Sequence, residues 1–178
     1  MSATDTNKLP PGIKIRNDLK PGDIGYLTYL HGTLYAEGYG WDYTFEGQVA
    51  VILGEFAKAH NERERIWVVE KDGTVAGSIA IVEASERNAQ LRLFLLHPSL
   101  RGHGIGRILM EEAISFCKDS NYSQVFLWTA SALTVAAKLY RSAGFQLAEE
   151  NTHELWSDVV TEQQYVLNLY RSYAVEKK

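Results

Sequence analysis

The sequence predicts an α/β domain built on a mixed β-sheet, and three observations point to it. Two segments near the N-terminus repeat apolar residues at helical spacing, and residues 65–84 read as two strands joined by an Asp-Gly turn. The middle of the chain then alternates strand, glycine-rich loop, helix and strand. The expected element order is β-α-α-β-β-β-α-β-α-β-β.

Length and composition favour one packed domain over residues 13–173, preceded by a loose polar tail over residues 1–12. The chain has 178 residues, of which 46% are hydrophobic, enough for a single core. Its net charge of −4 argues against a nucleic-acid partner, which would need a basic excess. The lack of a long apolar run argues against a membrane partner. The polar N-terminus and the single cysteine, Cys117, favour a cytoplasmic protein.

The N-terminal elements are a short strand and two helices. Residues 13–18 alternate between apolar and polar side chains, as a strand does. The first helix has Asp23 as its expected N-cap and stops at Gly38 and Gly40, and the second covers residues 44–60. The predicted buried faces are Ile24, Leu27, Leu30 or His31, and Leu34 in the first helix, and Phe45, Val49, Ile52 or Leu53, and Phe56 in the second.

A strand over residues 89–98, ended by Pro98, precedes the glycine-rich loop. Strict alternation places Leu91, Leu93 and Leu95 on one face and Arg92, Phe94 and Leu96 on the other. A helix from about Gly104 to Ser120 and a buried strand over residues 124–129 follow. A short helix within residues 131–145, closed by Gly144, leads to final strands over residues 145–150 and 162–171.

The loop RGHGIGR, residues 101–107, places three glycines where a helix must begin. The first amides of a helix have no partner inside it and carry partial positive charge, so an anion can bind there. Glycines at 102, 104 and 106 remove side chains from that approach, and Arg101 and Arg107 add formal charge. This pattern predicts a diphosphate site; the alternative is that the glycines only form a turn. Their spacing fits neither the dinucleotide fingerprint nor the P-loop.

Two elements of the sequence resemble the GNAT superfamily of N-acetyltransferases. Residues 101–106 match the acetyl-coenzyme A signature R/Q-x-x-G-x-G/A, and AAKLYRSAGF, residues 136–145, resembles the A-x-x-L-Y-x-x-x-G-F element. The resemblance extends from about residue 13 to residue 170 and is most specific in 91–147. Residues 21–42 further resemble the acetyltransferase half of MarR–GNAT fusion proteins.

The resemblance implies a coenzyme A site with acetyl-CoA as the cosubstrate and no metal. Backbone amides of the loop would hold the pyrophosphate, and Phe94, Leu95 and Leu96 would pair with the pantetheine arm as a further strand. The strands near 89–96 and 124–129 would splay apart to form the slot, with the acetyl carbonyl near the Leu95 or Leu96 amide. The implied cofactor residues are Phe94, Leu95, Leu96, Arg101, Gly102, His103, Gly104, Ile105, Gly106 and Arg107.

Tyr140 occupies the position where this family often has its general acid. A phenol with an ordinary pKa of about 10 is protonated at neutral pH and can donate to a leaving thiolate. The alternative is that Tyr140 only packs on the sheet. The family often carries asparagine seven residues earlier, where this chain has Leu133, so one cofactor contact is lost or is supplied by Ser131 or Thr134.

The acceptor site is expected around the first two helices. The segment YAEGYGWDYTFEG, residues 35–47, mixes aromatic rings with carboxylates, which suits a cationic amine. Candidate substrate residues are Glu37, Tyr39, Trp41 and Glu83. Glu37 and Glu83 are also candidates for the general base, with His31 and His97 as further options, and ordinary solvated carboxylates are the alternative.

The function that these features predict is transfer of an acetyl group from acetyl-CoA to a primary amine of a small molecule or protein. Direct attack in a ternary complex needs no enzyme thiol, and Cys117 is expected to be a core residue. The alternative is a non-catalytic sensor of acyl-CoA. A nucleotide binder of another fold is a third reading, which the glycine spacing disfavours. The resemblance also suggests a homodimer paired through the C-terminal strands.

Overall fold

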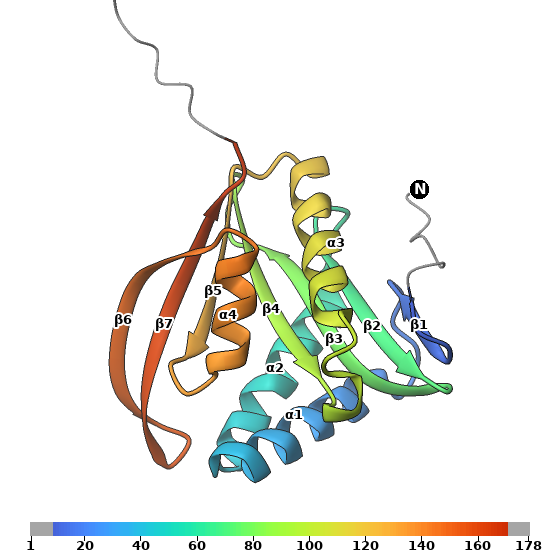
Figure 1. Cartoon of the computed structure of the whole chain (residues 1–178), viewed down its shortest axis with the longest axis vertical. Coiled ribbons are helices and arrows are strands. Elements are labelled where there is room, and N and C mark those ends of the chain that lie inside the picture. The colour runs from blue at the N-terminus through green and yellow to red at the C-terminus, as the bar shows by residue number, and fades with distance from the viewer. Residues whose placement is uncertain (1–8, 171–178) are drawn as a thin grey trace, which may run out of the picture.

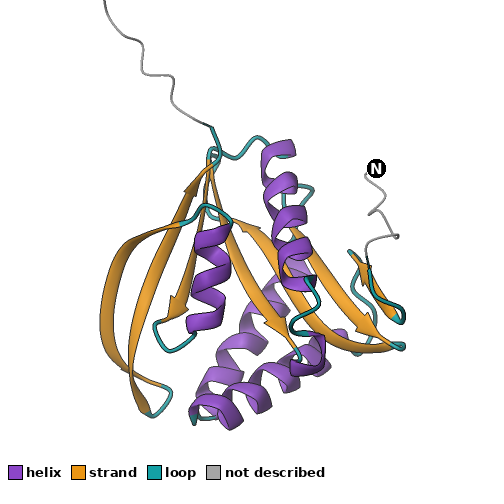
Figure 2. Ribbon diagram, viewed as in Figure 1, coloured by secondary structure: helices purple, strands orange, loops and turns teal. Residues whose placement is uncertain are grey.

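The computed structural model describes residues 9–170 and shows a seven-stranded sheet covered by helices on both faces (Figures 1 and 2). The strand order is β1-β2-β3-β4-β5-β7-β6. The strands are β1 (Ile13–Arg16), β2 (Arg65–Lys71), β3 (Thr74–Glu83), β4 (Asn88–Leu96), β5 (Gln124–Ala130), β6 (Gln146–Leu155) and β7 (Asp158–Asn168). The helices are α1 (Asp23–Tyr39), α2 (Tyr43–Ala59), α3 (Ile105–Asp119), α4 (Thr134–Ser142) and a single 3₁₀ turn, η2 (Pro98–Leu100).

This element order confirms the predicted order and the predicted mixed-sheet fold class, and within residues 9–170 the 3₁₀ turn η2 is an addition to it. Residues 1–8 of the predicted tail and 171–173 of the predicted domain lie outside the described residues. Within residues 9–170, no helix is both long enough and apolar enough to cross a bilayer.

Two apolar clusters hold the layers together, one on each face of the sheet. α3 and α4 cover the face nearer the viewer in Figure 1, and α1 and α2 cover the other. Leu109, Ala113 and Cys117 of α3 are fully buried against the sheet, and Leu27 of α1 and Leu53 of α2 are fully buried on the opposite side. Burial of these aliphatic side chains fixes the position of each helix over the strands.

The predicted alternation of β4 is wrong after Arg92, because the strand contains a β-bulge. Ser78 pairs with Leu95 and Ala80 pairs with Arg92, so Ile79 alone faces two residues of β4. Leu93 has φ 54°, and its carbonyl accepts a hydrogen bond of 2.6 Å from the buried Ser78 hydroxyl. Because of this extra residue, every later side chain of β4 points to the opposite face of the sheet from the one predicted.

The bulge changes which β4 side chains lie on each face of the sheet. Leu91 lies in the α3-side cluster, whereas Leu93 lies in the α1/α2-side cluster. Phe94 and Leu96 therefore join Leu91 on the α3 side instead of sharing a face with Arg92.

β4 and β5 pair only at one end, which confirms the predicted splay. The parallel ladder joins Asn88–Gln90 to Gln124–Phe126 and then stops. β5 turns away and pairs with β7 along its whole length. Figure 1 shows the two strands separating below this point, with α4 in front of the gap. The edge of β4 beyond Gln90 therefore has no strand partner on its β5 side.

The ends of α1 and α4 and the length of the last hairpin differ from the sequence prediction. Gly22, with φ 97°, is the N-cap of α1, and the Asp23 carboxylate instead forms a buried ion pair with Arg16 at 2.7 Å. α4 is capped by Ala143, one residue before Gly144. β6 and β7 are longer than predicted because their turn uses Trp156 and Ser157 in left-handed conformations rather than a glycine.

Candidate active site

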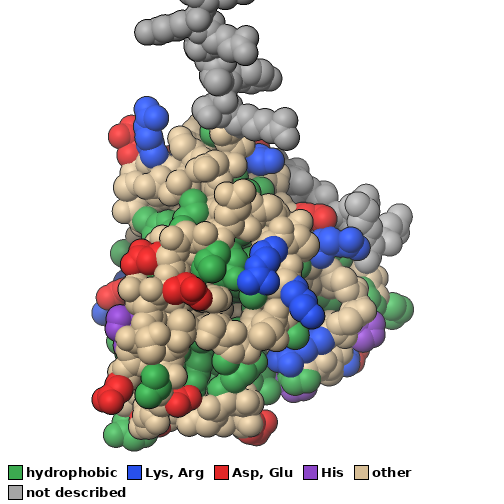
Figure 3. Space-filling view, turned by 60° about the vertical axis from the view of Figure 1, so that its left-hand side comes forward, with side chains coloured by type: hydrophobic (Ala, Val, Ile, Leu, Met, Phe, Trp, Pro, Cys, Tyr) green, Lys and Arg blue, Asp and Glu red, His purple; other side chains and the backbone are tan. Residues whose placement is uncertain are grey.

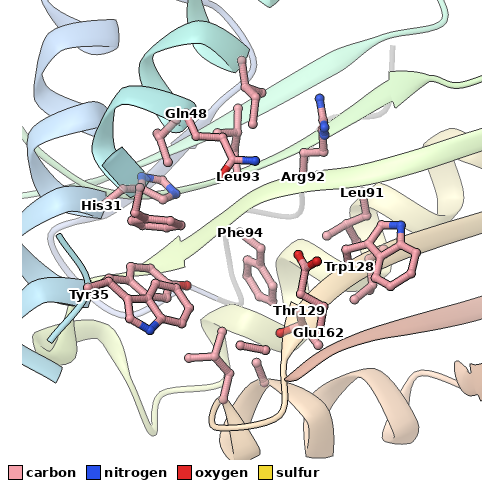
Figure 4. A pocket seen from close by; sticks show the side chains of 18 of the residues that line it. His31, Tyr35, Gln48, Leu91, Arg92, Leu93, Phe94, Trp128, Thr129 and Glu162 are labelled. Carbon is pink, nitrogen blue, oxygen red and sulfur yellow. The ribbon is translucent and has the colours of Figure 1, made fainter. Parts of the chain in front are cut away.

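Two cavities meet at the gap between β4 and β5. The hairpin-side cavity, about 190 Å³, is lined by α1, α2, β4, β5, α4 and the turn of the β6–β7 hairpin (Figure 4). The loop-side cavity, about 210 Å³, is lined by α1, β4, α4 and Arg101 of the glycine-rich loop. Four residues line both cavities: Tyr35, Phe94, Leu133 and Ala136. A ligand can therefore enter from the loop side and reach a second molecule held on the hairpin side.

The loop before α3 presents backbone amides without acceptors. Within residues 9–170, the first amide after Arg101 that is hydrogen-bonded to the backbone is that of Ile108, which donates to the Gly104 carbonyl at 3.1 Å. Gly102 and Gly104 both have φ 78°, and no atom lies within 4 Å of a side chain added at either. These glycines allow a left-handed turn and leave the approach to the amides open.

The other loop residues have separate positions. Gly106 lies against α4, where an added Cβ would be 3.2 Å from Leu139, so its lack of a side chain serves helix packing. The Ile105 side chain is buried in the core and can offer a ligand only its backbone. His103 and Arg107 are exposed at the mouth of the loop.

The loop-side cavity collects the predicted cofactor residues of β4. Phe94, Leu95 and Leu96 line it together with Arg101, whose Nε donates to the Leu96 carbonyl at 3.3 Å. Tyr39, predicted as a substrate residue, also lines this cavity and not the hairpin-side one. Arg101 thus links the end of β4 to the glycine-rich loop.

The Tyr140 side chain lies between the core and the hairpin-side cavity. It is 5% exposed and packs among Phe94, Phe145 and Tyr165, with ring centroids 5.9–6.2 Å away. The Tyr140 hydroxyl has no hydrogen-bond partner within residues 9–170. Every fully buried side-chain oxygen in that range has a partner, so this hydroxyl is not fully buried and is open to the cavity that Tyr140 lines. Burial raises the pKa of Tyr140, and nearby Tyr35 and Tyr165 raise it further, so the phenol keeps its proton.

His31 contributes a neutral imidazole to the same cavity. Its Nδ1 lies 2.8 Å from the Leu27 carbonyl, which must accept, so Nδ1 carries the proton. The other nitrogen, Nε2, has no partner in the described chain and opens toward the cavity that His31 lines. Burial lowers the pKa of His31 to about 4, so the ring is uncharged at neutral pH.

Five further polar side chains line the hairpin-side cavity: Gln48 of α2, Gln90 and Arg92 of β4, Thr129 of β5 and Glu162 of β7. Figure 4 shows the Arg92 side chain extending away from Glu162, whose carboxylate lies beside Thr129. Glu162 also forms an ion pair of 3.6 Å with His153 at the rim. The cavity therefore holds one positive and one negative side chain on different walls.

Aromatic rings close the hairpin-side cavity. Trp156, at the tip of the β6–β7 hairpin, lies 4.3 Å from Trp41 and 5.0 Å from Phe45 between ring centroids. Its indole N–H donates to Gln48 at 3.1 Å, and the adjacent Ser157 hydroxyl donates to the Asp42 carboxylate at 2.5 Å. The hairpin tip is thereby attached to the connection between α1 and α2.

The remaining predicted substrate and base residues lie in three different places. Trp41 lines the hairpin-side cavity as expected of a substrate residue. Glu37 is exposed on α1 and lines neither cavity. Glu83 also lines neither cavity and forms an ion pair with Arg63 at 2.5 Å. His97 caps the 3₁₀ turn, accepting from the Ser99 amide at 3.2 Å.

Comparisons with known proteins identify the family to which this chain belongs. A family model described as "Acetyltransferase (GNAT) family" matches residues 32–145. The chain belongs to the GNAT acetyltransferase family. Among curated relatives, human N-acetyltransferase 8B is 30% identical over 99 residues, which cover 53% of this chain and 44% of that protein. The chain thus spans less than half of that relative's length.

Solved structures show that the GNAT fold extends over most of the chain. An acetyltransferase from Streptococcus agalactiae is 19% identical and superimposes with a TM-score of 0.71, covering 89% of this chain and 99% of that one. Spermidine N-acetyltransferase from Vibrio cholerae, solved in complex with CoA and spermine, is 18% identical with a TM-score of 0.67, covering 90% and 97%. Both acetyltransferase structures share the fold of this chain.

Five polar residues that line the cavity of this GNAT chain are not among the predicted site residues: Gln48, Gln90, Arg92, Thr129 and Glu162. Arg92 had a usable signal, since it is the one charge inside the apolar run LRLFLL. Glu162 had none, because it is one of several polar residues on a half-exposed strand. Cys117 is fully buried in α3, and burial raises the pKa of its thiol to about 12, which leaves it unreactive. Within residues 9–170, no group of acidic, histidine and cysteine side chains forms a metal-ligand set.

Proposed function

We propose that this protein transfers the acetyl group of acetyl-CoA to a primary amine by direct attack in a ternary complex. The observation that carries the proposal is the open Tyr140 hydroxyl beside Phe94, where the cavity behind the glycine-rich loop meets a second, polar cavity. The loop amides and Arg101 have the chemistry to hold a diphosphate, and the unpaired edge of β4 has the chemistry to pair with an extended amide chain.

The described residues fit acetyl-CoA, which would supply the acetyl group as an activated thioester. Its diphosphate would lie against the amides of residues 102–107, with Arg101 and Arg107 at the mouth. The backbone of Phe94, Leu95 and Leu96 would hold the pantetheine arm. Leu133, at the N-cap of α4, lines both cavities and offers only apolar contact where relatives often have an amide side chain.

The chain's own residues supply the proton transfers of the reaction. The amine nitrogen forms a bond to the acetyl carbon while the carbon–sulfur bond breaks, and the Tyr140 hydroxyl donates its proton to the sulfur. The amine proton passes to Glu162 or to Nε2 of His31, directly or through water, and solvent reprotonates the phenoxide. The products are an acetamide and coenzyme A. Glu37 and Glu83 stay outside this scheme because neither lines a cavity.

Substitution of Tyr140 tests this assignment. We expect Tyr140→Phe to lower kcat by about 100-fold or more, the usual contribution of a general acid, while the Kd of acetyl-CoA stays within about twofold. Release of free thiol measures kcat, and calorimetry measures Kd. Tyr26→Phe, a matched change at an exposed position of α1, serves as the control. Unchanged turnover in Tyr140→Phe would remove the phenol from the mechanism.

Thiol release also separates transfer from the alternative of an acyl-CoA sensor. A sensor would bind acetyl-CoA and turn over no amine in a broad panel. The resemblance of residues 21–42 to GNAT domains that are fused to MarR-type regulators is consistent with the sensor alternative. A homodimer through the C-terminal strands is proposed on the exposed edge of β6 and is tested by light scattering in solution.

A further inference from the structure

Arg92 is a charged side chain in the hairpin-side cavity with no counter-ion. No ion pair or hydrogen bond to its guanidinium is formed within residues 9–170. Burial lowers the pKa of Arg92, and the Glu55 carboxylate of α2 acts in the opposite direction without coming within ion-pair distance. Arginine stays charged in proteins, so this cavity contains a cation without an ion-pair partner in the described chain.

The guanidinium is available to a ligand. Every fully buried side-chain nitrogen in the described chain has a hydrogen-bond partner, so the unpaired nitrogens of Arg92 are not fully buried, and the Arg92 side chain lines the cavity. Arg92 also faces away from the α3 side, because it follows Leu91, which lies in the α3-side cluster, and successive strand residues alternate between faces. A half-buried cation without an ion-pair partner is further stabilised by an anionic group of the acceptor.

A different wall provides the complementary charge. Glu162 lines the same cavity from β7, and no ion pair joins it to Arg92. A purely cationic acceptor would meet the field of Arg92 at close range, which costs free energy. An acceptor with both an ammonium and a carboxylate meets a partner on each wall. Trp41, Phe45 and Trp156 leave an apolar surface for the rest of the molecule.

We propose that the acceptor amine carries a free carboxylate, so that it belongs to the amino acids, and that Arg92 binds this carboxylate while Glu162 faces the amine. This inference rests on the proposed acetyl transfer and names its substrate class. It departs from the sequence-based expectation of a plain cationic amine, which was based on the aromatic and acidic segment at residues 35–47. It assigns Arg92 as a specificity-determining residue.

Matched acceptors test the inference. L-phenylalanine, L-leucine and 4-aminobutyrate are each compared with their own carboxamide, which keeps size and amine but removes the negative charge. Thiol release from acetyl-CoA gives kcat/KM for each. We expect at least one acid to exceed its amide, and Arg92→Gln to lower that acid-to-amide ratio by about 10- to 100-fold, the loss of one charge-assisted hydrogen-bonded contact. Comparing this ratio between the unsubstituted protein and Arg92→Gln cancels the difference in intrinsic amine reactivity between an acid and its amide.

The matched control is Arg87→Gln, which makes the same charge change on an exposed loop outside both cavities. Its acid-to-amide ratio should equal that of the unsubstituted protein. A ratio unchanged in Arg92→Gln would overturn the inference and leave acetyl transfer standing.

A protein that releases no thiol with any amine would overturn the proposed transfer instead. In that case, calorimetry with coenzyme A present decides the inference on binding alone. Tighter binding of an acid than of its amide, lost in Arg92→Gln, supports the carboxylate site. Equal binding of acids and amides contradicts it.

Discussion

The His31 ring is held in its neutral form by burial and by one backbone contact. Its proton is directed to the Leu27 carbonyl, and its other nitrogen faces the hairpin-side cavity. Tyr140 is likewise held in its neutral form, since burial raises the pKa of its phenol. The two groups are an acceptor and a donor of protons whose ionisation is set by desolvation rather than by a charged neighbour.

The neutral His31 predicts acid sensitivity of the fold. Its pKa of about 4 in the folded state lies below the ordinary 6.5, so the unfolded chain binds the proton first. The stability it contributes is present above pH 6.5 and is lost as the pH falls toward 4. Between pH 7.5 and 5 this amounts to about 2 kcal/mol.

Urea unfolding at the two pH values measures this loss. His31→Gln should lose about 2 kcal/mol less than the unsubstituted protein over that interval. His103→Gln, at an exposed position of the loop, should behave like the unsubstituted protein. Identical pH profiles for all three proteins would mean that His31 titrates normally.

β4 decides which backbone and side chains reach the cavities. The bulge at Leu93 turns Phe94 into the gap and leaves Arg92 on the opposite face. Gly77 of β3 lies against the end of the strand, where an added Cβ would stand 2.6 Å from the Leu95 carbonyl oxygen. The close approach of β3 therefore sets the position of the β4 segment proposed to bind pantetheine.

Gly77→Ala should displace that segment. Steric pressure on Leu95 and Leu96 should weaken acetyl-CoA binding by about tenfold and lower stability by about 1–3 kcal/mol, as overpacking does. Calorimetry and urea unfolding give the two quantities. Gly54→Ala, in α2 with no atom within 4 Å of the added carbon, is the control and should leave acetyl-CoA binding unchanged. Normal binding by Gly77→Ala would argue against a role for β4 geometry.

The molecule as a whole brings its two halves together over the acceptor cavity. Figure 3 shows a face on which acidic side chains gather mainly to the left and basic ones to the right.

On the hairpin side, Trp156 and Ser157 attach the β6–β7 turn to the α1–α2 connection. The two cavities therefore differ in what closes them, a hairpin for one and a glycine-rich loop for the other.

Trp156→Ala should affect only one of the two proposed ligands. Loss of the indole removes a wall of the hairpin-side cavity, so kcat/KM for the amine should fall by about tenfold, while acetyl-CoA affinity should stay within about twofold. Val159→Ala, on the same hairpin but exposed, should change neither quantity. An equal loss of both affinities would show that the cavities are not independent sites.

The element order and the glycine-rich loop could be predicted from the sequence because both depend on local signals. Periods of 3.6 and 2 residues mark helices and strands, and the positive φ of Gly102 and Gly104 requires glycine-like freedom at those positions. The same reasoning failed at Leu93, since no local signal in LRLFLL marks a bulge, and one extra residue reverses every facing after it.

The sequence by itself determined the fold class, the family resemblance and the loop proposed to bind phosphates. Only the tertiary structure decided which polar groups meet in the acceptor cavity. His31, Arg92 and Glu162 come from α1, β4 and β7, which are far apart in the chain and are brought together by sheet topology and the splay of β4 from β5. Their chemistry depends on burial and facing, and both are properties of the packed molecule rather than of any segment.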